Sequence, residues 1–405
     1  MPRGTPRIKI STQNHKNMSN RRTFLKTAGL MTAAAAMWKP SDLFAAKAVK
    51  KSGSKKLQLD WEDFQGIMKF TFHISGSSRT TTPIVITRLS WDGYEGYGEA
   101  AMPPYLGETQ ASCHEYYKKV IENVLPQFDN PFQIEDIMKA CDKITTNNTA
   151  AKASIDIALH ALCGNIMGQP WWKMWGFDAK KAPYTCYTIG YDESDEMLQT
   201  KLDEANWNKI IKVKLGMTEK EDKRMIEFIR ARDNRNIVID ANQGWKDKYY
   251  ALDMINWLAE KGVTMIEQPM SKYNLDEIAW VTERSPLPVM ADESCQRLTD
   301  IPKLKGAFHG INIKLMKCTG LYEARQMITM AEQLHMKLMV GCMTETSVAI
   351  SAAAQISPKM EWADLDGNYL LGNDCFEGMK LVDGRITLED KPGLGLAKKP
   401  GIISL

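Results

Sequence analysis

The stretch IIKVKLG, residues 210–216, places two lysines inside an otherwise apolar run. Side chains two residues apart in a β-strand point to the same face, so Lys212 and Lys214 face one side together. Two like charges on a half-buried face are costly unless a partner or a function uses them. The solvated edge of a sheet is the simple alternative, and the neighbouring stretches decide between the two.

Short apolar runs of this kind recur eight times between about residues 184 and 366, roughly 25 residues apart. Amphipathic stretches such as DKRMIEFIRARD (222–233) and ALDMINWLAEKG (251–262) fill the gaps between them. Strand followed by helix, repeated eight times, is typical of a (β/α)8-type barrel. The sequence therefore predicts an α/β fold with a barrel over residues 181–378.

The first third of the chain has a different pattern. Residues 56–100 alternate and turn like a small antiparallel sheet, with Asp92-Gly93 as a turn signal. Residues 109–168 have helical apolar spacing and end on a glycine. We expect an α+β domain over residues 49–180, to which the strand and loop of residues 379–405 return.

Residues 1–48 hold nine Lys or Arg and one acid. Arg21-Arg22, a short Ala-rich apolar run and the small-x-small sequence AKA (46–48) predict a twin-arginine export signal, and hence a periplasmic protein. A disordered basic tail with a short helix is the alternative. The apolar run is too short for an ordinary membrane span, so we expect none in the mature protein.

The rest of the composition excludes several classes of site. The formal net charge of +3 is set by the basic leader, so the body is mildly acidic and nucleic acid is an unexpected partner. The eight cysteines form no CxxC pair and accompany no histidine cluster, which argues against zinc. They are interpreted as small buried residues, with disulfides left open.

Charged residues stand at the carboxyl ends of five consecutive predicted strands: Lys214, Asp240, Glu267, Asp292 and Lys314. Strand ends of this kind meet at the mouth of a barrel, where its active sites lie. Three carboxylates without a softer ligand suit Mg²⁺, with Mn²⁺ as a substitute. Asn242 and Glu293 stand beside two of them.

A lysine on each side of such a metal suits proton transfer at a carbon next to a carboxylate. The metal would stabilise the enediolate, while one lysine removes the proton and the other returns it. Lys212 is expected to lower the pKa of Lys214 and to contact the bound carboxylate.

This set, KxK followed by D, E, D and K, resembles the enolase superfamily, muconate-lactonising subgroup, over about residues 56–400. The resemblance implies a modified (β/α)7β barrel with an N-terminal capping domain whose two loops close over the site. It also implies Lys214 and Lys314 as the acid/base pair and Asp240, Glu267 and Asp292 as the Mg²⁺ ligands.

The stretch ADLDG (363–367) discriminates between the reactions of the subgroup. Asp364 and Asp366 resemble the Asp-x-Asp that holds the α-ammonium of a dipeptide in dipeptide epimerases; a solvated turn is the alternative. By the same resemblance, Arg79 in the first capping loop is expected to meet a substrate side-chain carboxylate; a surface arginine is the alternative. From their positions, we also expect Tyr105, in the second loop, to shield the site from water, and Thr188, at the end of the first strand, to touch substrate.

We therefore expect an epimerase that inverts the α-carbon of the C-terminal residue of a dipeptide, L-Ala-D/L-Glu from cell-wall breakdown. An N-acyl- or N-succinylamino acid racemase or a cycloisomerase of the same subgroup is the alternative enzyme. A Schiff-base aldolase and a non-catalytic periplasmic binding protein are weaker readings, because neither needs two lysines around three carboxylates. The dipeptide is the expected partner, and a homo-oligomer is possible.

Overall fold

The computed structural model describes residues 55–74 and 77–405. The predicted export signal, residues 1–48, lies outside this described part. An antiparallel sheet opens the described chain, with strands in the order β1 (Gln58–Ile74), β2 (Ser77–Trp91) and β3 (Tyr94–Ala101). Asp92 and Gly93 both have positive φ, 47° and 81°, and form the predicted two-residue turn between β2 and β3.

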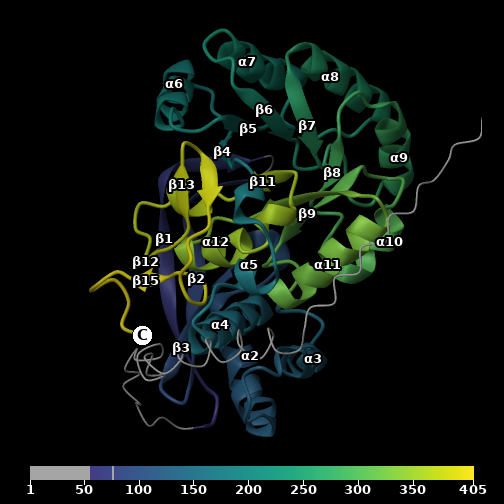
Figure 1. The fold of residues 1–405 in the computed structure, drawn as a ribbon. Coiled ribbons are helices and arrows are strands. Elements are labelled where there is room, and N and C mark those ends of the chain that lie inside the picture. The colour runs from purple at the N-terminus through teal and green to yellow at the C-terminus, as the bar shows by residue number, and fades with distance from the viewer. Residues whose placement is uncertain (1–54, 75–76) are drawn as a thin grey trace, which may run out of the picture. The chain divides into compact units, whose positions relative to one another are not determined.

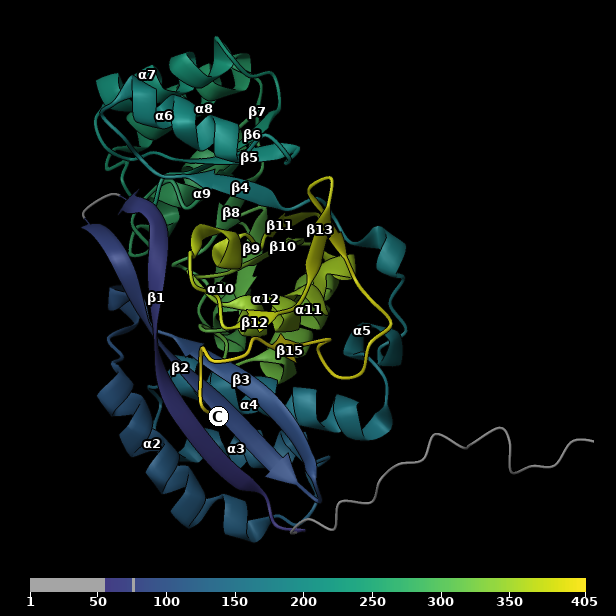
Figure 2. The ribbon, with the colours of Figure 1, turned by 90° about the vertical axis from the view of Figure 1, so that its left-hand side faces the viewer.

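Helices α2 (Gln110–Asn123), α3 (Ile134–Ile144) and α4 (Thr149–Met167) accompany this sheet (Figure 2). The almost entirely buried helix α4 packs against β2 and β3. Two glycines of β3 permit the close approach: a Cβ on Gly98 would lie 1.8 Å from the carbonyl oxygen of Ser154, and one on Gly96 would lie 2.3 Å from that of Ala158. Larger residues would push the helix off the sheet.

The eight predicted barrel strands are all present and parallel (Figure 1). They are β4 (Cys186–Ile189), β5 (Ile210–Lys214), β6 (Asn236–Asp240), β7 (Val263–Glu267), β8 (Val289–Ala291), β9 (Gly310–Lys314), β10 (Lys337–Gly341) and β11 (Trp362–Asp364). Neighbours in sequence are neighbours in the sheet, and a parallel bridge between Thr185 and Ala363 joins the first strand to the last. The sheet therefore closes into the predicted barrel.

Seven of the eight strands are followed by an α-helix. These helices are α6 (Asp195–Glu204), α7 (Glu219–Arg230), α8 (Lys248–Glu260), α9 (Leu275–Arg284), α10 (Ile301–Leu304), α11 (Leu321–Gln333) and α12 (Ser347–Ala354). After β11 a 3-10 turn, η8 (Gly367–Leu370), stands in place of an α-helix. The expected (β/α)7β barrel is confirmed. Among the described residues, no helix is both long and apolar enough to span a bilayer.

Short elements complete the chain. They are η3 (Pro104–Leu106), η4 (Leu125–Gln127), α5 (Trp171–Met174), η5 (Ala179–Lys181), η6 (Leu298–Asp300), η7 (Ser357–Lys359), β12 (Phe376–Glu377), β13 (Lys380–Val382), β14 (Arg385–Thr387) and β15 (Ala397–Lys398). The last residues reach the N-terminal sheet, because the amides of Ser404 and Leu405 donate to the Glu62 carboxylate of β1.

Two buried carboxylates connect the N-terminal unit, which consists of β1–β3 and α2–α4, to the barrel. Glu99 of β3 accepts hydrogen bonds from Thr346 N at 2.8 Å and Ala349 N at 3.1 Å, at the start of α12. Asp156 of α4 accepts from Leu321 N at the start of α11. Each carboxylate satisfies amides that a helix leaves unpaired at its first turn. Side chains of β3 and α4 therefore cap two helices of the barrel, α12 and α11.

Candidate active site

The interior of the barrel changes from apolar to charged along the strands. A small apolar cluster inside the barrel contains Cys186, Val238, Met265, Met290 and Met339. Two residues further along the chain from each of these come Thr188, Asp240, Glu267 and Gly341, on the same face of their strands, and Asp292, directly after β8. The alternation that buries Ile211 and Val213 in the main core turns Lys212 and Lys214 inward.

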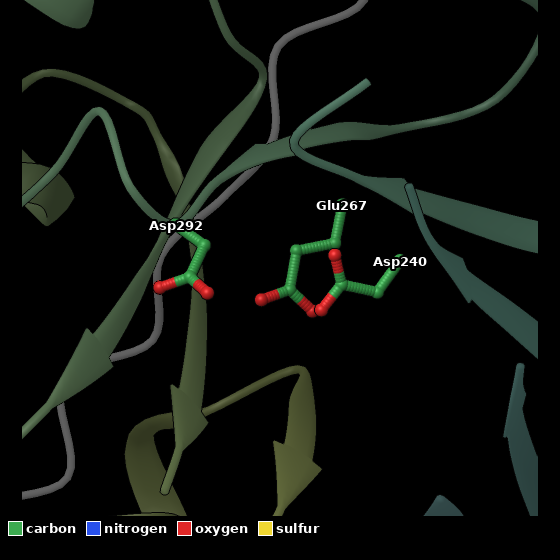
Figure 3. Close-up of side chains that lie close together, drawn as sticks. All are labelled: Asp240, Glu267 and Asp292. Carbon is green, nitrogen blue, oxygen red and sulfur yellow. The ribbon is translucent and has the colours of Figure 1, made fainter. Parts of the chain in front are cut away.

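The charged layer gathers three carboxylates from consecutive strands. Asp240 ends β6, Glu267 ends β7, and Asp292 directly follows β8. One oxygen of each lies within 4.8 Å of the others, and all three side chains are buried (Figure 3). Asn312 of β9 orients this group by donating to Glu267 Oε1 at 2.7 Å. The predicted carboxylate triad is thus assembled at the carboxyl ends of the strands.

The two lysines expected to act as acid and base stand on either side of these carboxylates. Lys214 Nζ donates to Asp240 Oδ2 at 2.6 Å, and Lys314 Nζ donates to Asp292 Oδ2 at 2.7 Å. Their strands, β5 and β9, flank the three carboxylate strands in the sheet. Both side chains are nearly buried, so neither is a solvated surface lysine.

Lys212 lies deeper than Lys214 and contacts three carboxylates of the protein. Its Nζ donates to Glu267 Oε2 at 2.7 Å and to Asp364 Oδ2 at 2.6 Å, and lies 3.1 Å from Asp240 Oδ2. Burial opposes its charge, but the attraction of Asp364, Glu267 and Asp240 holds its pKa well above the ordinary value. The expected contact of Lys212 with a bound carboxylate stays a prediction.

The electrostatics of the three carboxylates fit a divalent cation. Burial favours the neutral form of Asp240, yet the attraction of Lys214 and Lys212 lowers its pKa to about 2. Burial and repulsion by Asp240 raise the pKa of Glu267 to about 7. Buried carboxylates this close relieve their repulsion by protonation or by binding a cation, and an all-oxygen set suits Mg²⁺.

Asp364 and Asp366 are both buried, and both accept hydrogen bonds from Thr188. Thr188 Oγ1 donates to Asp364 Oδ1 at 3.3 Å, and the Thr188 amide donates to Asp366 Oδ2 at 2.6 Å. Asp364 is the last residue of β11, and Asp366 lies two residues beyond the end of that strand. Both are buried, which argues against the alternative of a solvated turn.

The two residues expected from capping loops lie in regular structure and reach the barrel mouth. Arg79 belongs to strand β2, because the first hairpin extends further than its sequence suggests; its Nη2 donates to Thr344 Oγ1 at 2.8 Å. Tyr105 lies in η3, with its hydroxyl 3.1 Å from Met343 Sδ. Both contacts join the N-terminal unit to the segment after β10.

Other charged groups of the site were not singled out from the sequence. Lys317 Nζ donates to Asp292 Oδ1 at 2.5 Å from a turn after β9. Glu345, buried after β10, accepts from Met343 N at 2.8 Å. The signal for Lys317 was its position three residues after Lys314, which places both on one side of a helical turn.

All eight cysteines lie in the described part of the chain, and all are buried and unpaired. Their interpretation as small buried residues is confirmed. Cys186 contacts the charged layer, with its thiol donating to Asp364 Oδ1 at 3.1 Å.

Comparison with known families matches both parts of the chain. A domain described as enolase C-terminal domain-like matches residues 196–400. A domain described as mandelate racemase / muconate lactonizing enzyme, N-terminal domain, matches residues 65–176. The two matches together span the carboxylates, the lysines and the residues that approach them from the N-terminal unit.

Individual relatives agree with these matches. The L-Ala-D/L-Glu epimerase of Bacteroides thetaiotaomicron is 51% identical over 388 residues, covering 94% of this chain and 100% of that protein. The L-Ala-D/L-amino acid epimerase of Flavobacterium johnsoniae is 34% identical, covering 81% and 96%. A solved structure, the dipeptide epimerase of Enterococcus faecalis complexed with Mg and L-Leu-L-Tyr, matches with a TM-score of 0.79 and 30% identity, covering 84% and 99%.

Proposed function

The chain belongs to the mandelate racemase/muconate lactonizing enzyme family of the enolase superfamily, and on that basis we propose that it is a magnesium-dependent dipeptide epimerase. The observation that carries this function is the placement of Lys214 and Lys314 on opposite flanks of three buried carboxylates. A binding protein would not need two lysines in these positions, whereas inversion at carbon needs a proton donor and a proton acceptor on opposite faces.

The lysines act on the α-carbon of the C-terminal residue. One lysine removes the α-proton from one face, and the other delivers a proton to the opposite face, which inverts the centre. The acidity of this carbon comes from its own carboxylate, which must therefore lie toward Asp240, Glu267 and Asp292. The reverse reaction uses the same two groups with exchanged roles.

The protonation of the lysines depends on the charge around them. Burial opposes the charge of Lys314, but Asp292 prevails and raises the pKa of this lysine well above its ordinary value. A bound Mg²⁺ would supply positive charge at the carboxylates, which favours a neutral lysine and stabilises the negative charge that develops on the substrate. Asp240, Glu267 and Asp292 are the residues that would hold it.

The ends of the substrate fit the remaining charged groups. Asp364 and Asp366 offer carboxylates to the α-ammonium of the dipeptide, and Arg79 offers a guanidinium to a side-chain carboxylate at the second position. Relatives named L-Ala-D/L-Glu epimerase and L-Ala-D/L-amino acid epimerase support alanine first and glutamate among the second residues. We propose L-Ala-D/L-Glu as the substrate.

The predicted export signal suggests where the enzyme would meet such a dipeptide. Arg21-Arg22 and the apolar run after them support export through the twin-arginine route to the periplasm. Dipeptides of alanine and glutamate arise there from cell-wall peptides, so we propose a role in peptidoglycan breakdown. Export is tested by fractionating cells that make the natural chain and a variant with Arg21→Lys and Arg22→Lys; the variant should stay in the cytoplasm.

A dipeptide library in D₂O tests the activity. The purified enzyme with Mg²⁺ should introduce one deuterium at the α-carbon of the second residue, seen as a mass increase, and L-Ala-L-Glu should respond most strongly. Incorporation into N-succinylamino acids but not into free dipeptides would favour the racemase instead. Absence of exchange in both sets would contradict an acid/base function for the two lysines.

A further inference from the structure

Lys317 is a deeply buried charged group beside the carboxylate triad that the proposed mechanism does not use. It follows β9 by one turn, with its amide donating to Lys314 O at 3.0 Å. Only 1% of its surface is exposed. A buried ammonium loses its hydration, so it persists only where other groups replace the lost water.

The three N–H groups of this ammonium have three acceptors. Nζ donates to Asp292 Oδ1 at 2.5 Å, to Asp292 O at 2.7 Å and to Asn312 O at 3.1 Å. A lysine has no further donor, so Lys317 has none left for a substrate. Two of its three contacts hold one residue, Asp292, by both its side chain and its main chain.

Lys314 and Lys317 hold opposite oxygens of the same carboxylate. Lys314 donates to Asp292 Oδ2 at 2.7 Å, which is its one hydrogen bond among the described residues, while Lys317 donates to Oδ1. Lys314 can therefore leave Asp292 for a substrate proton, because it gives up one contact. Lys317 would give up three, so it remains as the fixed partner of the carboxylate.

We propose that Lys317 is a positioning residue that fixes the orientation of the Asp292 carboxylate and thereby sets the affinity of the triad for its divalent cation. The inference rests on the proposed function only in assigning Asp292 as a metal ligand. With Oδ1 held by Lys317, Oδ2, which only Lys314 contacts by a hydrogen bond among the described residues, is the oxygen left for a cation. Without Lys317, the carboxylate can rotate and the preorganised ligand set is lost.

Direct metal binding tests this role without substrate. Mn²⁺ alone is titrated into the metal-free, full-length protein, with binding followed by the electron paramagnetic resonance of free Mn²⁺. Groups that orient metal ligands change metal affinity by about 10–100-fold when removed, so Lys317→Met should raise the Mn²⁺ Kd by that factor. Lys317→Gln, which keeps a donor but removes the charge, should also bind more weakly.

Lys152 provides a matched control. It is equally buried and is held by Asp142 at 2.7 Å and the carbonyl of Thr145 at 2.5 Å, in the N-terminal unit. Lys152→Met should lower the melting temperature but leave the Mn²⁺ Kd within about threefold, well below the effect of removing an orienting group. Comparing Lys152→Met with Lys317→Met separates the general effect of losing a buried lysine from the specific effect of losing Lys317.

The outcomes decide between positioning, catalysis and mere stability. Equal Mn²⁺ affinity in the natural protein and Lys317→Met would overturn the inference, and so would failure of both Lys317 variants to fold in excess Mn²⁺. At saturating Mn²⁺, Lys317→Met should recover its kcat, whereas a lost acid or base would not recover. If the natural protein binds Mn²⁺ but epimerises no dipeptide, the proposed function fails while this inference stands.

Discussion

Lys212 donates a hydrogen bond of 2.6 Å to Asp364, which joins strand β5 to strand β11 inside the barrel. Asp366, two residues later, forms no ion pair among the described residues and accepts instead from the Thr188 amide. Burial and repulsion by Asp364 raise the pKa of Asp366 to about 7. The two aspartates are thus unequal, because the charge of Asp364 is already compensated.

This inequality predicts that Asp366 contributes more than Asp364 to binding the α-ammonium. A charge-assisted contact contributes about 1.5–3 kcal/mol, so Asp366→Asn should lower kcat/KM for Ala-Glu by about 10–150-fold. N-acetyl-Ala-Glu, which lacks the ammonium, should be a poor substrate of the natural enzyme. Its kcat/KM should fall little further in Asp366→Asn. Asp364→Asn should instead lower kcat/KM for both substrates, because it removes a partner of Lys212. Good turnover of N-acetyl-Ala-Glu by the natural enzyme would favour the racemase.

Glu345 predicts a pH dependence of stability. Burial is the largest cause that raises its pKa from 4.5 to about 7, with Asp364 adding repulsion and Lys314 opposing it. A carboxyl group whose folded pKa is raised contributes stability below its unfolded pKa and loses it as pH rises toward the folded value. The chain should therefore lose free energy of unfolding between about pH 4.5 and 7 on account of this group.

Glu345→Gln imitates the neutral form and should remove that loss. Relative to the natural protein, the variant should gain stability at pH 8 compared with pH 5, measured by thermal unfolding at both values. Glu122→Gln, at an exposed position of α2, provides the control and should show no such difference. An unchanged pH profile in Glu345→Gln would mean that the Glu345 carboxyl does not titrate in this range.

Metal removal should abolish activity, because the carboxylates then have no cation between them. Chelator treatment followed by dialysis should eliminate epimerisation, and Mg²⁺ or Mn²⁺ should restore it. Mg²⁺ at about 100 times its Kd should stabilise the folded chain by about 2.7 kcal/mol, seen as a higher melting temperature. Glu267→Gln should lose both responses. Full activity of a verified metal-free preparation would contradict the assignment of the three carboxylates as ligands of a required metal ion.

Each of the two lysines should be necessary for inversion. Lys214→Ala and Lys314→Ala should both stop epimerisation, because the proton must leave one face and return on the other. Either variant can retain solvent exchange of the α-proton of one epimer, since the remaining lysine still faces one side of the carbon. Proton NMR in D₂O separates exchange from inversion. Normal turnover by Lys314→Ala would rule out the two-base mechanism.

The sequence predicted the barrel and its charged layer because both follow from alternation along strands. Apolar residues facing the helices and charged residues facing inward produce the pattern of IIKVKLG, and strand order then brings the ends together. The partners of Lys317 were not visible, because two of its three acceptors are backbone carbonyls, of Asp292 and Asn312. No residue pattern encodes a contact to a carbonyl from a turn.

Arg79 shows why the N-terminal unit was harder to predict. The expected loop is part of strand β2, where an arginine in a polar run of threonines and serines gives no apolar alternation to read. Its position over the barrel depends on the length of the hairpin and on contacts far along the chain, such as the one to Thr344. The spacing of residues within β2 predicts neither the length of the hairpin nor these distant contacts.

Arg79 predicts selectivity for an acidic second residue. Burial lowers its pKa, yet a guanidinium stays charged at neutral pH, and near the barrel mouth it can pair with a substrate carboxylate. Arg79→Ala should lower kcat/KM for Ala-Glu by about 10-fold or more, and that for Ala-Leu by much less. Thr344→Val removes the hydroxyl at 2.8 Å from Arg79 and should reproduce part of the loss, because it removes one of the contacts that orient the guanidinium. Equal losses for Ala-Glu and Ala-Leu in Arg79→Ala would mean that the arginine supports the hairpin and does not read the substrate.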